Sequence, residues 1–168
     1  ASVAANLAYA APASMLEASN PFAKESTLPF KYPAFDKIKN EHFAPAFAEA
    51  MRQEALEVEA IANNKAAPTF ENTIVAMERS GQLLNRVQAA FGTLNGSYTN
   101  DTLQAIQRSL SPKLAAHSDA IRLNEKLYAR IKSLYDKRDK LKLDAESLRL
   151  LIINSQCTES LRPVAASP

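Results

Sequence analysis

The sequence feature that most constrains the fold is a long series of large apolar residues spaced three, four or seven positions apart. It runs from Phe70 to Tyr98, and only Gly81 interrupts it. A seam of this kind is typical of two long helices packed side by side. We therefore predict a helix that begins at Thr69, which suits the N-cap position, and ends near Tyr98. Gly81 either lets a neighbouring helix approach closely or weakens the helix.

Two further stretches show the same helical spacing. Residues 41–63 carry an apolar stripe, with Glu49 among the charged residues that lie off it, and this pattern predicts the first helix. A break follows Tyr98, and Asn100 there is a good cap for another helix. We expect that helix to restart or kink at Pro112, because proline interrupts the backbone hydrogen bonding.

The apolar stripe continues beyond Pro112 in two segments that meet near Asn124, and a last helix starts near Asp144. No segment shows sustained alternation of apolar and polar residues. Apolar residues make up 46% of the chain and only 3 residues are Gly, a composition that favours helix over strand. For residues 20–151 we therefore predict an all-α fold of about four or five long antiparallel helices.

The segment before the first helix is rich in proline and aromatic residues. Those in residues 20–40 are Pro21, Phe22, Pro29, Phe30, Tyr32, Pro33 and Phe35. Proline prevents regular helix, and a free linker rarely carries so many large apolar groups. We expect an extended strap that lies on a hydrophobic surface.

Residues 1–19 form a leader that is rich in Ala and Ser and nearly uncharged. They include Ala8-Tyr9-Ala10, a small-x-small pattern of the kind found at signal-peptide cleavage sites. The leader is either the remnant of an export signal, which predicts a periplasmic protein, or a flexible Ala-rich extension of a cytoplasmic one. The single cysteine, Cys157, excludes an internal disulfide and leaves the compartment open.

The charge balance argues against two classes of partner. The chain has 20 Lys plus Arg and 18 Asp plus Glu, and a net charge of +2 calls for neither nucleic acid nor an acidic membrane. Its apolar runs fall well short of the roughly 20 residues that a membrane-spanning helix needs. The basic segment 126–142, which includes Arg130, could bind phosphates, but its interleaved acids and two tyrosines favour a solvated helix face.

Residues that could carry catalysis are few. A hydrolytic zinc site on a helix usually needs His-Glu-x-x-His and a further ligand, but His42 and His117 are far apart in sequence and Pro45 follows His42 closely. We interpret His42 as structural and His117 as a packed or surface residue. Cys157 lacks the signature of a Cys-His nucleophile. We therefore predict no catalytic, cofactor-binding or metal-binding residue in this chain.

Several short stretches occur in an order that is informative as a whole. The most specific is Pro68-Thr69-Phe70-Glu71-Asn72-Thr73-Ile74. The others are Asn20-Pro21-Phe22, Leu28-Pro29-Phe30, Pro33-Ala34-Phe35-Asp36, His42-Phe43-x-Pro45-Ala46-Phe47, Ala76-Met77-Glu78-Arg79-Ser80-Gly81 and Leu114-Ala115-Ala116-His117. From Asn20 to about Leu151 the chain thereby resembles the start of the thimet oligopeptidase family of zinc peptidases. Within that family it most resembles the bacterial peptidyl-dipeptidases, also called dipeptidyl carboxypeptidases.

The resemblance implies a much longer parent protein, almost wholly helical and shaped like a clam shell around a deep channel. It implies zinc held by His-Glu-x-x-His and a later Glu, all downstream of the matched stretches, and the hydrolysis of short peptides with release of C-terminal dipeptides. This chain would be the non-catalytic N-terminal portion that walls the channel, with the remaining catalytic part as its partner. The alternative is a stand-alone, truncated helical interaction or peptide-binding module without catalytic activity.

Residues 152–168 depart from the family pattern, which would continue as helix with a Phe-Val-Arg-Ala-Gly-like stretch. Codons for Ser160-Leu161-Arg162-Pro163, read one base later, can encode Ala-Phe-Val-Arg. This indicates a shifted reading frame, and a deliberately cut chain with appended residues is the rival explanation. Under either, we expect the tail to be poorly specified by the fold. Helix faces that normally pack on the rest of the enzyme would be exposed, so we also expect self-association, with helix exchange as one route.

Overall fold

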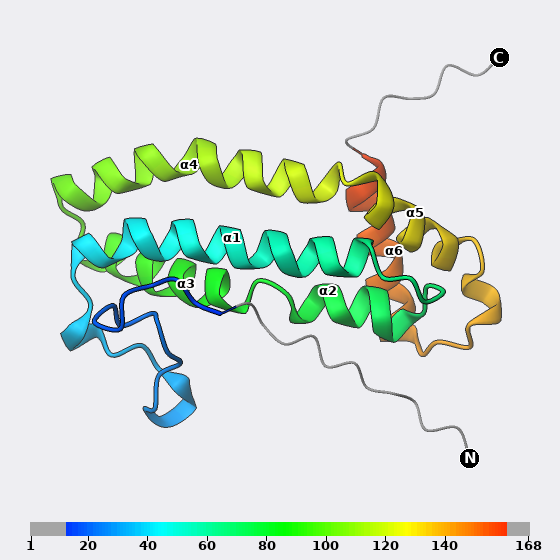
Figure 1. Cartoon of the computed structure of the whole chain (residues 1–168), viewed down its shortest axis with the longest axis horizontal. Helices are drawn as coiled ribbons and strands as arrows, with labels where there is room; N and C mark the ends of the chain where they lie inside the picture. Colours follow the sequence, from blue (N-terminus) through cyan, green and yellow to red (C-terminus); the bar gives the residue numbers. More distant parts are fainter. Residues whose placement is uncertain (1–12, 161–168) are drawn as a thin grey trace.

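The computed structural model describes residues 13–160 and shows an elongated arrangement of helices (Figure 1). Every regular element within these residues is helical and no strand occurs among them, which confirms the predicted all-α fold. The central element is α1, Phe43–Ala62, because α3, α4 and α5 all pack against it. The predicted cleavage pattern Ala8-Tyr9-Ala10 and the frame-shift position Arg162 lie outside the described residues.

Helices α3, Gln82–Ser97, and α4, Asp101–Arg122, both lie along α1. As Figure 1 shows, α3 runs antiparallel to α1, whereas α4 runs parallel to it. Side-chain hydrogen bonds near both ends and the middle of α1 join residues that are 60 or 63 positions apart, a nearly constant separation that two helices keep only when they run the same way. The pairs are Asn40–Asn100, Glu54–His117 and Asn63–Lys126.

The C-terminal half of α1 packs against a second group of helices. After α1 the chain forms a π-helical segment, Phe70–Val75, and the short helix α2, Ala76–Arg79. Helix α5, Glu125–Tyr135, and helix α6, Ala145–Glu159, pack on each other, and both contact the π-helical segment. Helices α3 and α4 and this second group therefore all pack on α1.

The apolar core consists of two clusters along α1. The first includes Phe43 and Phe47, whose rings both meet Phe91 of α3 edge-on, with centroids 5.0 and 5.5 Å apart. The second includes Val58 and Ile61 of α1, packed with buried residues of the π-helical segment, α5 and α6. Because α1 contributes buried apolar residues to both clusters, the helices at both of its ends pack against it.

The predicted helix starts are confirmed by N-cap hydrogen bonds. In each, a side-chain oxygen accepts from the backbone N–H three residues later and so satisfies a donor that the helix itself leaves free. The pairs, with the cap first, are Thr69–Asn72, Asn100–Leu103, Asn124–Leu127 and Asp144–Ser147.

The predicted restart at Pro112 is not observed. Helix α4 continues through Pro112, although proline cannot donate a backbone hydrogen bond. The hydroxyl of Ser111 donates, at 2.8 Å, to the carbonyl oxygen of Gln107, which is the residue before Arg108, whose carbonyl loses its helical donor at Pro112. The chain breaks only after α4, at Asn124, where the second predicted junction lies.

The predicted continuous helix from Thr69 to Tyr98 is wrong, because the chain breaks at Ser80 and Gly81. Gly81 has a φ of 67°, in the left-handed region that favours glycine. Its N–H donates to Glu57 Oε2 at 2.8 Å, and a Cβ added to it would lie 2.5 Å from Glu54 Oε1. Gly81 therefore separates α2 from α3, and its lack of a side chain lets α1 pack close to the backbone there.

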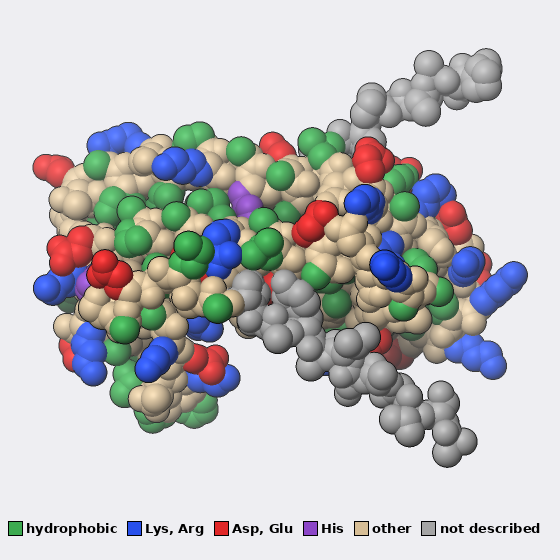
Figure 2. All heavy atoms as spheres, viewed as in Figure 1, with side chains coloured by type: hydrophobic (Ala, Val, Ile, Leu, Met, Phe, Trp, Pro, Cys, Tyr) green, Lys and Arg blue, Asp and Glu red, His purple; other side chains and the backbone are tan. Residues whose placement is uncertain are grey.

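The N-terminal strap is only partly as predicted. It contains short 3-10 turns, Pro29–Lys31, Phe35–Lys37 and Asn40–His42, and Phe22 is buried in the first core cluster. Phe30 and Tyr32, however, are exposed, against the expectation that the strap's aromatics lie on a hydrophobic surface. They belong to a projection at the left of Figure 1, where Figure 2 shows hydrophobic side chains at the surface.

The tail after Leu151 was expected to be poorly specified by the fold, and its described part is not. Helix α6 continues to Glu159 without a break at Ile152. Ser155 and Thr158 are buried, because both face the same side of α6 as Leu151. The fold therefore accommodates at least the first half of the tail as regular helix.

Candidate functional site

The three sequence candidates for catalysis lie on separate elements. His42, before α1, accepts a hydrogen bond at Nδ1 from the Lys39 N–H at 3.0 Å. His117 of α4 pairs with Glu54 of α1, with Nε2 and Oε2 2.7 Å apart. Cys157 is exposed on α6. Of the two interpretations of His117, packed or surface, the structure supports the packed one, because its side chain is only 12% exposed. Its carboxylate partner is a feature that sequence spacing does not predict.

The zinc ion implied by the family resemblance finds no ligand set in the described part of the chain. Hydrolytic zinc sites take three protein ligands and leave one position for water. Among residues 13–160, no three His, Cys, Asp or Glu side chains come together in a way that could hold a metal ion. His117 is already paired with Glu54. These residues do not fit zinc.

Arg130 corrects the interpretation of 126–142 as a solvated basic face. Its side chain is buried, and its guanidinium donates to the carbonyl oxygens of Asn64 and Ala66, at 2.7 and 3.0 Å, and to Asn72 Oδ1, at 2.8 Å. It also lies 3.3 Å from the Thr73 hydroxyl. Burial lowers the pKa of Arg130. Arg130 therefore fastens α5 to the loop after α1.

Glu49 is also buried, although its position was predicted to lie off the apolar stripe. Its carboxylate accepts hydrogen bonds from Arg52, at 2.7 and 2.8 Å, from Gln53, at 2.7 Å, and from the Met15 N–H, at 3.0 Å. Chiefly because Arg52 donates to it, the pKa of Glu49 falls from 4.5 to about 2. Arg52 also donates to the Ala13 carbonyl oxygen, so this group ties the leader's described end to α1.

The depressed pKa of Glu49 predicts an acid dependence of stability. The ionised carboxylate stabilises the folded chain fully above its unfolded pKa of 4.5, and this contribution is lost as the pH falls toward 2. We expect Glu49→Gln to be less stable than the wild type at neutral pH, and the difference to shrink as the pH falls from 4.5 to 2. Urea unfolding followed by circular dichroism over this range measures it. A difference that stays constant with pH would contradict the assignment.

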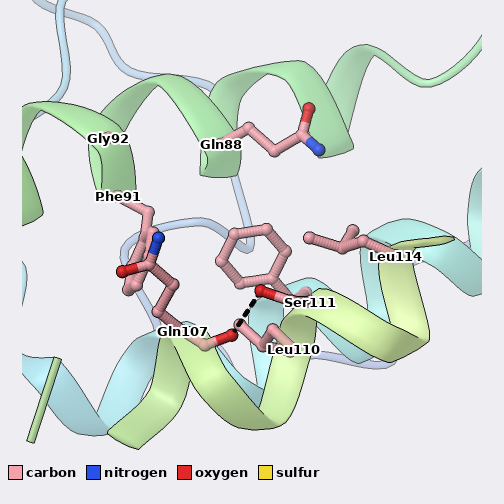
Figure 3. A pocket seen from close by; sticks show the side chains of 8 residues that line it. Gln88, Phe91, Gly92, Gln107, Leu110, Ser111 and Leu114 are labelled. Carbon is pink, nitrogen blue, oxygen red and sulfur yellow. Dashed lines mark hydrogen bonds between the residues drawn. The ribbon is translucent and has the colours of Figure 1, made fainter. Parts of the chain in front are cut away.

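A small cavity lies between α3 and α4 (Figure 3). Its volume is 170 Å³, and Phe47 of α1 contributes to its lining. Phe91 of α3 and Leu110 and Leu114 of α4 supply further apolar surface. We call this feature the α3–α4 groove. Because a cavity of about 150 Å³ lined by apolar side chains holds a benzene molecule, the groove has room for one large apolar side chain.

The α3–α4 groove is lined without a single charged side chain. Its polar lining comes from Gln88 of α3 and from Gln107 and Ser111 of α4, all labelled in Figure 3. The Ser111 hydroxyl is satisfied within its own helix, and Gln107 Oε1 accepts a bond from Asn95 Nδ2 across the two helices at 2.8 Å. In a chain of which 23% is charged, a neutral groove suits an apolar occupant.

A second hollow, of 480 Å³, lies between the strap and α3. Charged residues of both signs contribute to its lining, among them Lys37, Asp36 and Arg86. The wider surface is similar, since Figure 2 shows acidic and basic side chains interspersed on the visible face. None of the helices in the described residues is long and apolar enough to cross a membrane. Neither the second hollow nor the charge pattern selects one ligand chemistry.

Comparison with curated proteins relates the chain to peptidases. It is 46% identical over 138 residues to a dipeptidyl carboxypeptidase of Salmonella typhimurium and 44% identical over 137 residues to one of Escherichia coli. Each match covers 82% of this chain and 20% of the relative. Oligopeptidase A of Escherichia coli is 28% identical over 108 residues, which cover 64% of this chain and 16% of that protein. No family model matches the chain.

These relatives belong to the thimet oligopeptidase family, and they confirm the family resemblance predicted from the short motifs. The two that match the larger part of this chain carry the name dipeptidyl carboxypeptidase, as the sequence motifs predicted. The chain spans about one fifth of the length of these two relatives.

Proposed function

We propose that this chain is the N-terminal, non-catalytic portion of a zinc-dependent peptidyl-dipeptidase. The observation that carries the proposal is the identity of 44% and 46% to two dipeptidyl carboxypeptidases over 82% of the chain. The parent enzyme would hydrolyse short peptides and release C-terminal dipeptides. Zinc and the reacting groups would lie in its remaining catalytic part, since residues 13–160 offer no set of metal ligands.

Within the parent, this portion would wall the substrate channel. Helix α4 supports this role because it packs mainly on α1 and leaves most of its surface uncovered: of its 22 residues, Leu103 and Leu110 are the buried ones. A layer of long helices with one packed side and one open side suits the edge of a channel. Such a wall would admit short unstructured peptides and exclude folded proteins.

We place the parent in the periplasm, with the cytoplasm as the alternative, on the basis of the small-x-small pattern at Ala8-Tyr9-Ala10. Self-association of the chain in isolation stays a prediction, and so does the absence of nucleic-acid and membrane partners. Light scattering at high concentration tests self-association, because a monodisperse monomer would contradict it.

A stand-alone helical interaction module is the second candidate function. The α3–α4 groove favours it, because an apolar groove between two helices can receive a peptide or helix without any chemistry. The two functions differ in whether a catalytic part is needed. A module binds and releases its ligand unchanged, whereas the peptidase portion acts only together with a zinc-containing catalytic part.

Intact mass spectrometry of the native protein, paired with a hydrolysis assay on a short blocked peptide with added zinc, tests the proposed function. We expect a species much larger than 18.4 kDa, or an 18.4 kDa chain with a co-purifying partner, that releases dipeptides in a zinc-dependent way. The chain of 168 residues should be inactive alone. A lone native species of 18.4 kDa that binds peptides without cleaving them would establish the interaction module instead.

A further inference from the structure

We propose that the α3–α4 groove is the docking site for an apolar-faced helix of the catalytic part of the peptidase. This inference rests on the proposed function and adds to it the surface through which the two parts join. The groove lies between α3 and α4, and the buried Phe47 of α1 contributes to its lining (Figure 3). Helices α3 and α4 both pack on α1. A further helix laid in the groove would contact α3 and α4 on the side that α1 leaves free.

The size and chemistry of the groove define what it takes. At 170 Å³ it holds one large apolar side chain, such as Leu or Phe, from a helix lying along the groove. Phe47 and Phe91 are buried and Leu114 is half-buried, so the inserted side chain would contact rings and a branched aliphatic group. The neutral lining means that no charge loses its hydration when the helix docks.

Gly92 is the glycine of α3 that lines the groove, and it leaves room there for a close neighbour. It lines the groove in the middle of α3, and a Cβ added to it would meet nothing within 4 Å. Its φ is not positive, so the backbone does not require glycine, and glycine within a helix is less stable than alanine. A helix backbone docked against Gly92 would use the space that a side chain there would otherwise fill.

The occupant follows from the lengths of the relatives. The matched segment is 20% of each dipeptidyl carboxypeptidase, so four fifths of such a protein lies outside it and can supply the missing helix. Recognition would be by apolar side chains at helical spacing, which is how a helix binds in a groove. A second copy of this chain is the rival occupant, and the test is designed to exclude it.

The experiment uses two forms of the protein: the 168-residue chain, and a chimaera in which this chain replaces the matched segment of the relative that is 46% identical. Gly92→Leu fills the groove. Gly96→Leu is the matched control, since Gly96 is one turn further along α3, also has nothing within 4 Å of an added Cβ, and does not line the cavity. Thermal unfolding and sedimentation velocity are measured for every variant.

We expect both substitutions to leave the midpoint of the isolated chain unchanged or raised, because the space is open there. In the chimaera, Gly92→Leu should lower the midpoint by roughly 4 °C or more through overpacking, and Gly96→Leu should not. Equal effects of the two substitutions in the chimaera would overturn the proposal. So would a dimer of the isolated chain that Gly92→Leu alone abolishes, since the occupant would then be a second copy.

A second measurement covers a chimaera that does not fold. The isolated chain is mixed with the same relative lacking its matched residues, and association is measured by sedimentation. Gly92→Leu should weaken association at least about tenfold relative to Gly96→Leu, and the absence of any association would overturn the proposal. Dipeptide release by the unsubstituted chimaera is measured in a separate assay, which tests the proposed function independently of the docking site. A stable chimaera that shows the Gly92 effect without releasing dipeptides would refute the proposed function and leave the docking site standing.

Discussion

Replacement of Arg130 by methionine is expected to lower the free energy of unfolding by about 3 kcal/mol. Methionine fills a similar volume, but it leaves the carbonyl oxygens of Asn64 and Ala66 and the Asn72 side chain without the donors that now satisfy them. For a chain of this size the loss corresponds to a fall of roughly 6–12 °C in the unfolding midpoint. Urea unfolding monitored by circular dichroism gives the value directly.

Two comparison variants separate the geometry of Arg130 from its charge. Arg130→Lys keeps the positive charge but cannot reach several acceptors with one planar fork, so we expect it to lose most of the same stability. Lys132→Met changes an exposed cation of the same helix whose partner is Asp136, and an exposed pair of this kind contributes at most about 1 kcal/mol. An Arg130→Lys chain as stable as the wild type would show that charge alone matters and that the hydrogen bonds do not.

The burial of Arg130 was open to prediction from the apolar pattern of α5. Leu127, Ile131 and Leu134 are buried, and position 130 lies on the same face because it is three residues after one and four before another. The many basic residues around position 130 favour a solvated face and conceal this spacing. The acceptors could not be predicted, since they lie 57 to 66 residues away in sequence, and only the folded chain brings them to α5.

The burial of Glu49 on α1 could likewise be predicted from helical spacing. It lies three residues after Ala46 and four before Gln53, both buried, so the helical period places it on the packed face. Charge suggested an exposed position, but a carboxylate is tolerated there because Arg52 and Gln53 donate to it. Periodicity thus outweighed residue type at both positions.

Helix starts were predictable because their signals are local, whereas the groove was not. An N-cap needs only its own side chain and an N–H three residues later, and Asn100, Asn124 and Asp144 all meet this condition. The α3–α4 groove depends on how far two helices stand apart, which is set by the packing of each on α1. The family resemblance, by contrast, could be predicted without any of this geometry, because it depends only on the identity and order of short motifs in the sequence.

The polar section of α1 connects these observations. Between the two core clusters, α1 presents Glu54 and Glu57, which contact His117 of α4 and the backbone of Gly81 respectively. The parallel helix α4 and the break before α3 are therefore both positioned from the same turn of α1. A change at that turn should affect the arrangement of α3 and α4 together, and with it the α3–α4 groove.

Replacement of Gly81 by alanine is expected to lower the free energy of unfolding by about 2–4 kcal/mol. A Cβ is disfavoured at a φ of 67°, and it would lie 2.5 Å from Glu54 Oε1, so Glu54 would have to move away from His117. Gly92→Ala is the control in the same helix: its added Cβ meets nothing within 4 Å, and alanine there should be neutral or stabilising by up to about 1 kcal/mol. Urea unfolding of both variants measures the difference.

The contact with Glu54 can be separated from the backbone strain at Gly81 by a double-mutant cycle. Glu54→Ala removes the carboxylate that the new Cβ would meet, so Gly81→Ala should destabilise the Glu54→Ala variant less than it destabilises the wild type. The remaining cost would be the left-handed conformation alone, about 1–2 kcal/mol. Equal costs in the two backgrounds would show that Glu54 moves freely and that Gly81 is required only for its φ. A cost no larger than that of Gly92→Ala would refute both reasons for glycine at this turn, and with them the role of this section of α1 in positioning α3.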